Sequence, residues 1–274
     1  MDRQGCLSHR QHAIFSASSM LRRCLAHPLT RGLSIDSPQT TELRRQIIRG
    51  NRFLEHIYKE WCEAVSQRLP DVPGQVLELG SGGGILADYI PHAITSEVFP
   101  CSGIRMVADG RSLPLASGSL RAIVLLDVLH HIPEVRRFFR EAARCLGPGG
   151  AVIMLEPWVS RWSRFVYTRF HHEPFQSESP DWSFPEQGPL SGANIALPWI
   201  VFERDRALFE AEFPELRIEQ IQPLMPFRYL VSGGVSMRSL MPGAATPLWR
   251  ALERSLEPWM RHWAMFALIL LRRV

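Results

Sequence analysis

The chain has 274 residues, of which 46% are hydrophobic and 21% are charged. This composition is typical of a globular protein and excludes a disordered or fibrous one, and the absence of repeats excludes a solenoid. The net charge of +4 arises within the first 31 residues, so the rest of the chain is close to neutral. A nucleic-acid-binding body usually carries a basic stripe, so we expect no nucleic-acid partner.

The first 30 residues are rich in Arg, Ser and His and poor in acidic residues. Such a composition is typical of a transit peptide, but a leader before a true start at Met20 would look the same. We interpret residues 1–40 as a flexible leader.

The five cysteines are far apart and form no Cys-x-x-Cys pair. An odd number without such spacing predicts free thiols and a cytoplasmic location. The longest apolar run, residues 263–271, is too short to span a membrane, which needs about 20 residues. We expect a final strand at residues 264–271, and the alternative is a short peripheral membrane anchor.

Apolar residues recur at helical spacing between residues 41 and 69, which predicts an N-terminal helical layer over residues 41–72. From residue 75 onward, short apolar strands alternate with helical segments, and this pattern predicts a parallel sheet. The expected strands are 76–79, 93–99, 104–108, 122–126, 151–155 and 216–221, and the expected helices are 85–90, 135–146 and 198–212.

Residues 76–84 read Val-Leu-Glu-Leu-Gly-Ser-Gly-Gly-Gly, which places a glycine turn directly after a strand. Glycine suits such a turn because it adopts positive φ and lets the backbone approach a ligand. Ligands of open α/β sheets bind at this carboxyl edge, and a helix that follows the turn would present free N–H groups to them. The nicotinamide fingerprint G-x-G-x-x-G fails, because Ile85 stands at its last position.

Glu78, Gly80, Gly82 and Gly84 form the pattern E-x-G-x-G-x-G. With this pattern, residues 75–157 resemble the class I S-adenosylmethionine-dependent methyltransferases, in particular the type 11 group acting mostly on small molecules. The resemblance implies S-adenosylmethionine as cofactor. It also implies a Rossmann-like, doubly wound, mostly parallel seven-stranded α/β sheet with a C-terminal antiparallel strand, formed here by residues 73–274.

The resemblance also implies roles for individual residues. Glu97, where Ser-Glu-Val replaces the family's usual Gly-x-Asp, would bind the ribose hydroxyls; Asp109 would accept a hydrogen bond from the adenine amine; and Asp127 would lie beside the methionine moiety. Leu129-His130-His131-Ile132 and residues 144–150 also match the family. The predicted cofactor-binding residues are Glu78, Gly80, Ser81, Gly82, Gly84, Glu97, Asp109, Gly110 and Asp127.

Methyl transfer needs a base only where the acceptor must lose a proton. The candidate catalytic residues are His130, His131 and Glu156, and the His171-His172-Glu173 segment offers further candidates. That segment could also bind a metal. However, two adjacent imidazoles rarely converge on one ion, so we expect no metal site.

Two segments, at about 157–197 and 222–260, are rich in aromatic residues or methionine and predict caps over the active site. Such caps suit a small, hydrophobic metabolite or a lipid-linked acceptor, although the aromatic side chains could instead form the caps' own core. The alternatives are a protein or nucleic-acid methyltransferase and a non-catalytic protein that binds the cofactor.

Overall fold

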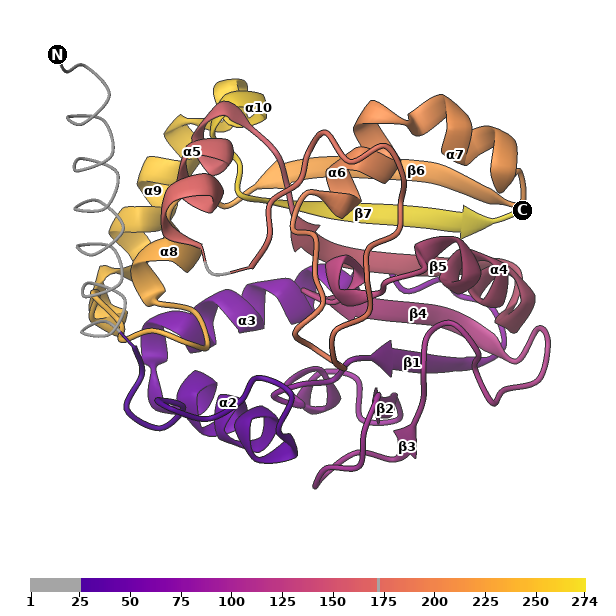
Figure 1. The fold of residues 1–274 in the computed structure, drawn as a ribbon, viewed down its shortest axis with the longest axis horizontal. Helices are drawn as coiled ribbons and strands as arrows, with labels where there is room; N and C mark the ends of the chain where they lie inside the picture. Colours follow the sequence, from indigo (N-terminus) through magenta and orange to yellow (C-terminus); the bar gives the residue numbers. More distant parts are fainter. Residues whose placement is uncertain (1–25, 172) are drawn as a thin grey trace, which may run out of the picture.

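The computed structural model describes residues 26–171 and 173–274, so the interpretation of residues 1–25 and a start at Met20 lie outside the described residues. A seven-stranded sheet with the order β3-β2-β1-β4-β5-β7-β6 forms the centre (Figure 1). The strands are β1 (Gln75–Leu79), β2 (Ile94–Glu97), β3 (Met106–Val107), β4 (Leu120–Leu126), β5 (Leu146–Pro157), β6 (Leu216–Leu224) and β7 (Phe266–Arg273).

Strands β1 to β5 pair in parallel, and β7 is antiparallel to both β5 and β6. This order confirms the predicted Rossmann-like fold with an antiparallel C-terminal strand. Residues 268–271 are buried in the sheet between β5 and β6, so the strand interpretation of this segment is correct and the anchor interpretation is wrong for β7. Among the described residues, no helix is long and apolar enough to cross a membrane.

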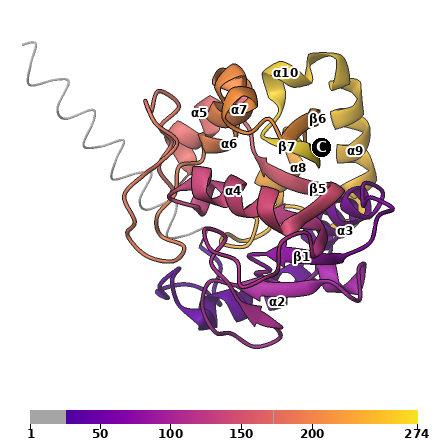
Figure 2. The ribbon, with the colours of Figure 1, turned by 90° about the vertical axis from the view of Figure 1, so that its right-hand side faces the viewer.

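Helices cover both faces of the sheet (Figure 2). One face packs on α2 (Pro38–Gly50) and α3 (Arg52–Ser66), which form the predicted N-terminal layer. Asn51 separates the two helices, and its side chain accepts hydrogen bonds from the backbone N–H groups of Phe53 and Leu54, the usual way to cap a new helix.

The other face packs on α4 (Val135–Cys145), α6 (Leu197–Trp199), a π-helical turn (Ile200–Arg204) and α7 (Arg206–Glu212). The single helix predicted over 198–212 is therefore divided by the π-helical turn. Phe139 of α4 lies at the centre of this layer and makes edge-on ring contacts with Phe202, Phe209 and Phe213.

The helix predicted over residues 85–90 is wrong. Only one 3₁₀ turn, Leu86–Asp88, forms there. The backbone of Gly82 and Gly84 has positive φ, which a helix cannot use, and Pro91 follows at once. A helix N-terminus therefore does not face the ligand edge at this point, and the loop must hold a ligand by other groups.

The two insertions meet over the carboxyl ends of the parallel strands, on the left of Figure 1. They contain α5 (Arg161–Phe170), α8 (Arg228–Ser232), α9 (Thr246–Ser255) and α10 (Met260–Trp263). Several of their aromatic side chains, including Trp158 and Trp182, are buried within the core of the domain rather than over a cavity. The described cysteines, Cys62, Cys101 and Cys145, are free, as predicted.

A buried ion network holds the second insertion on α3. Arg228 Nε lies 2.5 Å from Glu253 Oε2, and Arg228 Nη1 lies 2.6 Å from Glu60 Oε1. Glu253 Oε1 also accepts hydrogen bonds from the backbone N–H groups of Phe227 and Arg228.

We expect Glu253→Ala to lower the free energy of unfolding by about 3–5 kcal/mol. The substitution leaves the buried Nε of Arg228 and two backbone N–H groups without an acceptor, although Glu60 still pairs with Arg228 Nη1. Urea unfolding measures the change. Glu257→Ala, at an exposed position just after α9, is the matched control and should change stability by less than about 0.5 kcal/mol. Equal effects of the two substitutions would contradict a stabilising role for the network.

Candidate active site

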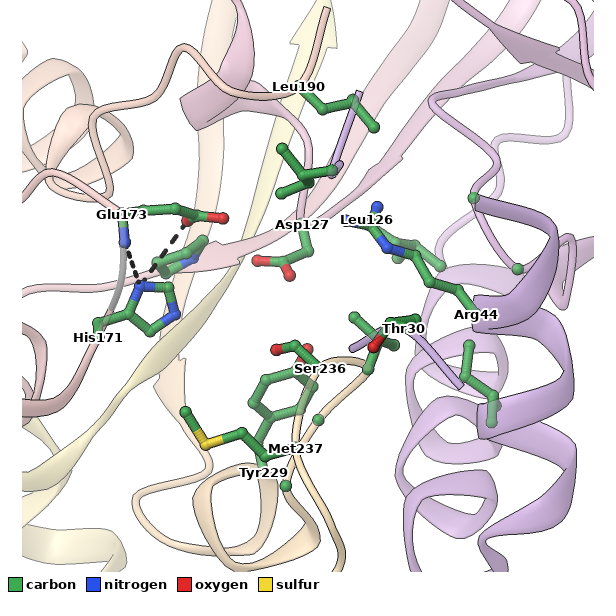
Figure 3. Close-up of a pocket in the computed structure, with 18 of the residues that line it drawn as sticks. Thr30, Arg44, Leu126, Asp127, His171, Glu173, Leu190, Tyr229, Ser236 and Met237 are labelled. Carbon is green, nitrogen blue, oxygen red and sulfur yellow. Dashed lines mark hydrogen bonds and ion pairs between the residues drawn. The ribbon is translucent and has the colours of Figure 1, made fainter. Parts of the chain in front are cut away.

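A cavity of about 1360 Å³ opens at the carboxyl ends of β1 and β4. Its walls come from the glycine loop, α2, α3, α5 and the segment 229–240. Residues 26–37, which the leader prediction included, also contribute to its rim: His27 N–H donates to Ser236 O at 2.9 Å, and Asp36 Oδ1 accepts from Leu190 N at 2.7 Å. The cavity thus lies between segments distant in the sequence (Figure 3).

The glycine loop occupies the inner end of this cavity. Gly80, Gly82 and Gly84 have φ of 67°, 50° and 61°. A Cβ on Gly80 would also lie 2.7 Å from Val128 Cγ2, so a side chain is excluded there by both φ and space. Arg45 Nε donates to Gly83 O at 2.7 Å, which ties the loop to α2.

Glu97 lies at the carboxyl end of β2, as predicted, and its side chain reaches the glycine loop. Its Oε1 accepts the Gly82 N–H at 2.6 Å. Ser81 has a structural role, because its hydroxyl accepts the Ser96 N–H at 3.0 Å and its backbone N–H donates to Ser96 O at 2.8 Å. These hydrogen bonds hold the glycine loop against the end of β2, and the Glu97 carboxylate lies where the two meet.

Glu78 is buried at the end of β1, and its Oε2 has no hydrogen-bond partner among the described residues. Burial raises the pKa of Glu78 to about 8. The nearby Glu97 charge also raises this pKa, whereas the Ser81 hydroxyl and Arg45 lower it. A buried acid with an unsatisfied oxygen at a cavity wall suits a cationic ligand. S-adenosylmethionine fits, because it carries a sulfonium and an α-ammonium group.

This environment predicts that binding of S-adenosylmethionine strengthens with pH. A cation lowers the pKa of Glu78, so the complex binds one proton fewer and affinity rises by up to about tenfold per unit between about pH 6 and 7. The charged or titratable groups near Glu78 are Arg45 of α2, Cys62 of α3 and Glu97 of β2. Calorimetric titration in two buffers measures the released proton. Glu78→Gln should flatten the profile, and an unchanged profile would contradict this assignment.

Asp127 follows β4 with a φ of 64°, a left-handed conformation that is uncommon outside glycine. Its backbone N–H donates to Leu155 O at 2.8 Å, which keeps the residue on the sheet. The side chain points into the cavity between Glu173, Arg44 and Tyr229 (Figure 3). Burial raises its pKa to about 7; His130 opposes this shift, and the charges of Glu156 and Glu173 add to it.

Asp109 lines a second, smaller cavity that shares Gly80, Glu97 and Val128 with the first. Its carboxylate is already bound by Arg111, whose Nη2 lies 2.7 Å from Oδ2 and whose backbone N–H lies 2.8 Å from Oδ1. Partial burial would raise the pKa of Asp109, but the hydrogen bonds from Arg111 outweigh it and lower the pKa. An adenine amine would therefore have to compete with Arg111 for this carboxylate.

A strap formed by residues 184–192 closes the second cavity. Arg111 holds it from one side through Glu186, with two contacts of 3.1 Å, and Asp36 holds it from the other. Gly110, on the floor of the same cavity, is tightly packed, because a Cβ there would lie 2.7 Å from Leu79 Cδ2. Neither Arg111 nor Asp36 stands in a motif, so sequence spacing could not identify this closure.

The three predicted catalytic residues lie together, but two of them are fully engaged in structure. Glu156 Oε1 accepts the N–H groups of Val128 and Leu129, and its Oε2 lies 2.9 Å from His130 Nδ1. Burial opposes the charged form of His130, yet its interactions with the Glu156 and Glu173 carboxylates raise its pKa well above 6.5. A protonated imidazole is a poor general base.

His131 lines the cavity, and its Nδ1 lies 3.2 Å from Gly192 O. Burial and the neighbouring His130 lower its pKa to about 3, so the ring is neutral at physiological pH. Glu173 faces both imidazoles from the first insertion. The motifs missed four residues that line the cavity from helices outside any family motif: Arg44, Tyr58, Tyr167 and Tyr229.

Residues 53–188 match the family model of a methyltransferase domain. Among solved structures, the geranyl diphosphate C-methyltransferase of Streptomyces coelicolor A3(2) is 14% identical, with 81% of this chain and 78% of that chain covered and a TM-score of 0.48. An S-adenosylmethionine-dependent methyltransferase from Mesorhizobium loti is 18% identical, with 77% and 96% covered and a TM-score of 0.44. The [4+2]-cyclase SpnF is 15% identical, with 78% and 80% covered and a TM-score of 0.45. None of these similarities assigns a substrate to this chain.

Three observations agree on the family. The strand order with an antiparallel β7 matches the expected fold, and the E-x-G-x-G-x-G loop follows β1. The family model covers this loop and strands β1 to β5. Residues 53–188 therefore form a methyltransferase domain of the class I S-adenosylmethionine-dependent type.

Proposed function

We propose that the protein transfers a methyl group from S-adenosylmethionine to a small, largely apolar acceptor with an acidic or polar head. The size and lining of the main cavity carry this proposal. At about 1360 Å³ it exceeds the roughly 300–1,000 Å³ of a pocket for one ligand, and therefore has room for cofactor and acceptor together.

The two ends of the cavity differ in chemistry. The inner end carries Glu78, Glu97 and Asp127, which suit the cationic and hydroxyl groups of the cofactor, as the family resemblance implies. The outer end is lined by apolar side chains that include the exposed Phe170 and Leu240. An apolar acceptor body suits this outer end.

Arginines at the rim favour an amphipathic acceptor. Arg31, Arg169 and Arg238 line the cavity and are exposed, whereas Arg44 reaches further in toward Asp127 (Figure 3). Arginine binds carboxylates and phosphates in a bidentate manner. An acceptor with an apolar body and an anionic head, such as a fatty acid or a lipid-linked intermediate, would place its body against the apolar side chains and its head near the arginines.

The reaction is an in-line displacement. The acceptor nucleophile forms a bond to the methyl carbon while the bond from carbon to the sulfonium sulfur breaks, and S-adenosylhomocysteine leaves. The protein contributes mainly by holding the two reactants in line. Where the acceptor is a hydroxyl, its proton must leave, and Asp127, with a pKa of about 7, is the cavity acid that suits proton acceptance near neutral pH.

A transfer assay with isotopically labelled S-adenosylmethionine tests the proposal. The panel contains fatty acids, phenols, quinones and polyprenyl phosphates beside polar peptides and RNA, with products read by mass spectrometry. Methylation of apolar acceptors alone supports the proposal. Methylation only of peptides or RNA would favour the protein or nucleic-acid alternative, and cofactor binding without any product would favour the non-catalytic one.

We also propose a cytoplasmic protein with peripheral membrane contact through α9 and α10. Leu248, Leu252, Trp259 and Trp263 are exposed there, and tryptophan is common where proteins meet a membrane surface. Co-sedimentation with phosphatidylglycerol vesicles tests this contact. Binding that survives the change of Leu248 and Trp259 to serine would contradict it.

A further inference from the structure

We propose that His130, His131 and Glu173 form a binding site for one divalent transition-metal ion of the zinc type. One ligand atom from each residue lies within 4.8 Å of the other two. His130 and His131 belong to a 3₁₀ turn, Leu129–His131, that follows β4, and Glu173 comes from the first insertion. The proposed site thus forms where the cap meets the sheet.

Both imidazoles are oriented as metal ligands usually are. His130 Nδ1 faces Glu156 Oε2 at 2.9 Å, and His131 Nδ1 faces Gly192 O at 3.2 Å. A bound ion displaces any proton on Nε2, and a ring that donates its Nδ1–H to such an acceptor then coordinates through Nε2. This arrangement is the common outer shell of metal-bound histidine. Glu156 is itself held by two backbone N–H groups, so the acceptor is rigid.

The two Nε2 atoms face different oxygens of one carboxylate. His130 Nε2 lies 3.5 Å from Glu173 Oε2, and His131 Nε2 lies 3.7 Å from Glu173 Oε1. These separations exceed the roughly 2.7–2.9 Å of a charge-assisted hydrogen bond. They are close to the roughly 3.3 Å between ligand atoms around a tetrahedral ion with bonds of about 2.0–2.1 Å.

The donor set and its surroundings select the class of ion. Two imidazole nitrogens and one carboxylate suit Zn²⁺, Fe²⁺ or Co²⁺, whereas Mg²⁺ and Ca²⁺ prefer oxygen ligands. His131, Glu173 and the nearby Asp127 line the main cavity, so a further coordination position would face the acceptor. On the proposed function, the ion would polarise an acceptor oxygen there.

The proposed metal site differs from the His171-His172-Glu173 segment that the sequence analysis considered as a metal site. The adjacent pair expected not to converge was His171 and His172, and residue 172 lies outside the described residues. The argument against adjacent histidines fails for His130 and His131, because their 3₁₀ turn brings the ring centroids to 4.2 Å with an angle of 40° between the planes.

Metal binding can be measured without turnover. The full chain is treated with a chelator, dialysed, and titrated with ZnCl₂ in a calorimeter and with CoCl₂ by visible absorption. We expect one ion per chain and cobalt bands typical of coordination by nitrogen and oxygen. His131→Gln should weaken binding by roughly 100-fold or more, beyond the roughly 10–100-fold typical for loss of an outer-shell partner, and should remove those bands.

Two further samples complete the test. His92→Gln, at an exposed position away from the cluster, should bind metal like the native chain. Glu173→Gln separates the proposed site from other histidines, because it leaves every imidazole in place. Native metal affinity in both His131→Gln and Glu173→Gln, or no stoichiometric binding by the native chain, would overturn the proposal. S-adenosylmethionine is titrated into the same samples, so failure of the metal site is distinguishable from failure of cofactor binding.

Discussion

Glu97→Ala should weaken S-adenosylmethionine binding by roughly 10²–10³-fold. The carboxylate offers two oxygens toward the position implied for the ribose, and hydrogen bonds to a charged group contribute about 1.5–3 kcal/mol each. It also holds the Gly82 N–H at 2.6 Å, so its removal loosens the loop as well. Calorimetric titration measures the change.

Two comparisons make this result specific. S-adenosylhomocysteine carries the same ribose, so its binding should fall by a similar factor. Asp88→Ala removes an exposed acid that pairs with Arg49 away from the cavity, and should leave affinity unchanged. An affinity of Glu97→Ala within threefold of the native value would mean that the ribose is bound elsewhere.

Glu156→Ala should lower the free energy of unfolding by about 4–5 kcal/mol. It would remove the acceptor of two backbone N–H groups and of His130 Nδ1 in a fully buried position. Each orphaned donor costs about 1–3 kcal/mol, and an unpaired buried charge costs more. Such a loss is a large part of the stability of a typical domain.

The Glu156→Gln variant separates structure from catalysis. Its amide oxygen can still accept from Val128 and Leu129, so urea unfolding should show a smaller loss, of about 2–3 kcal/mol. A Glu156→Ala protein with native stability but no methyl transfer would show instead that this residue acts in the reaction.

The strands could be predicted because their signal is local. Buried parallel strands read as short apolar runs, and all seven predicted strands are present with shifted ends. The helix predicted at residues 85–90 failed because Gly82 and Gly84 before it have positive φ and Pro91 directly follows it, so only one 3₁₀ turn forms. The apolar spacing that suggested this helix correctly indicated buried side chains, because Ile85, Leu86 and Ile90 pack in one core with α2 and α3.

Site residues could be predicted from the sequence only where a single family motif assigns a role to a single residue. Gly80, Glu97 and Asp127, which the family resemblance assigns to the cofactor, line the cavity. The pairing of Glu156 with His130, and of Glu173 with both imidazoles, joins residues from different segments, and their orientation depends on the complete fold. Sequence spacing cannot distinguish a carboxylate that is free to act as a base from one, such as Glu156, that already accepts backbone N–H groups of a turn.

The position of β7 has a consequence for biosynthesis. Residues 266–273 form the strand between β5 and β6, and Pro157 pairs with Phe266 across more than a hundred residues of chain. On a ribosome, β5 therefore has no neighbour on that side until β7 has emerged. Its apolar edge therefore stays exposed from the synthesis of β5 until the end of translation. Long-range pairing of this kind is slow and prone to aggregation. Expression of soluble protein should accordingly respond to chaperone supply and to growth temperature.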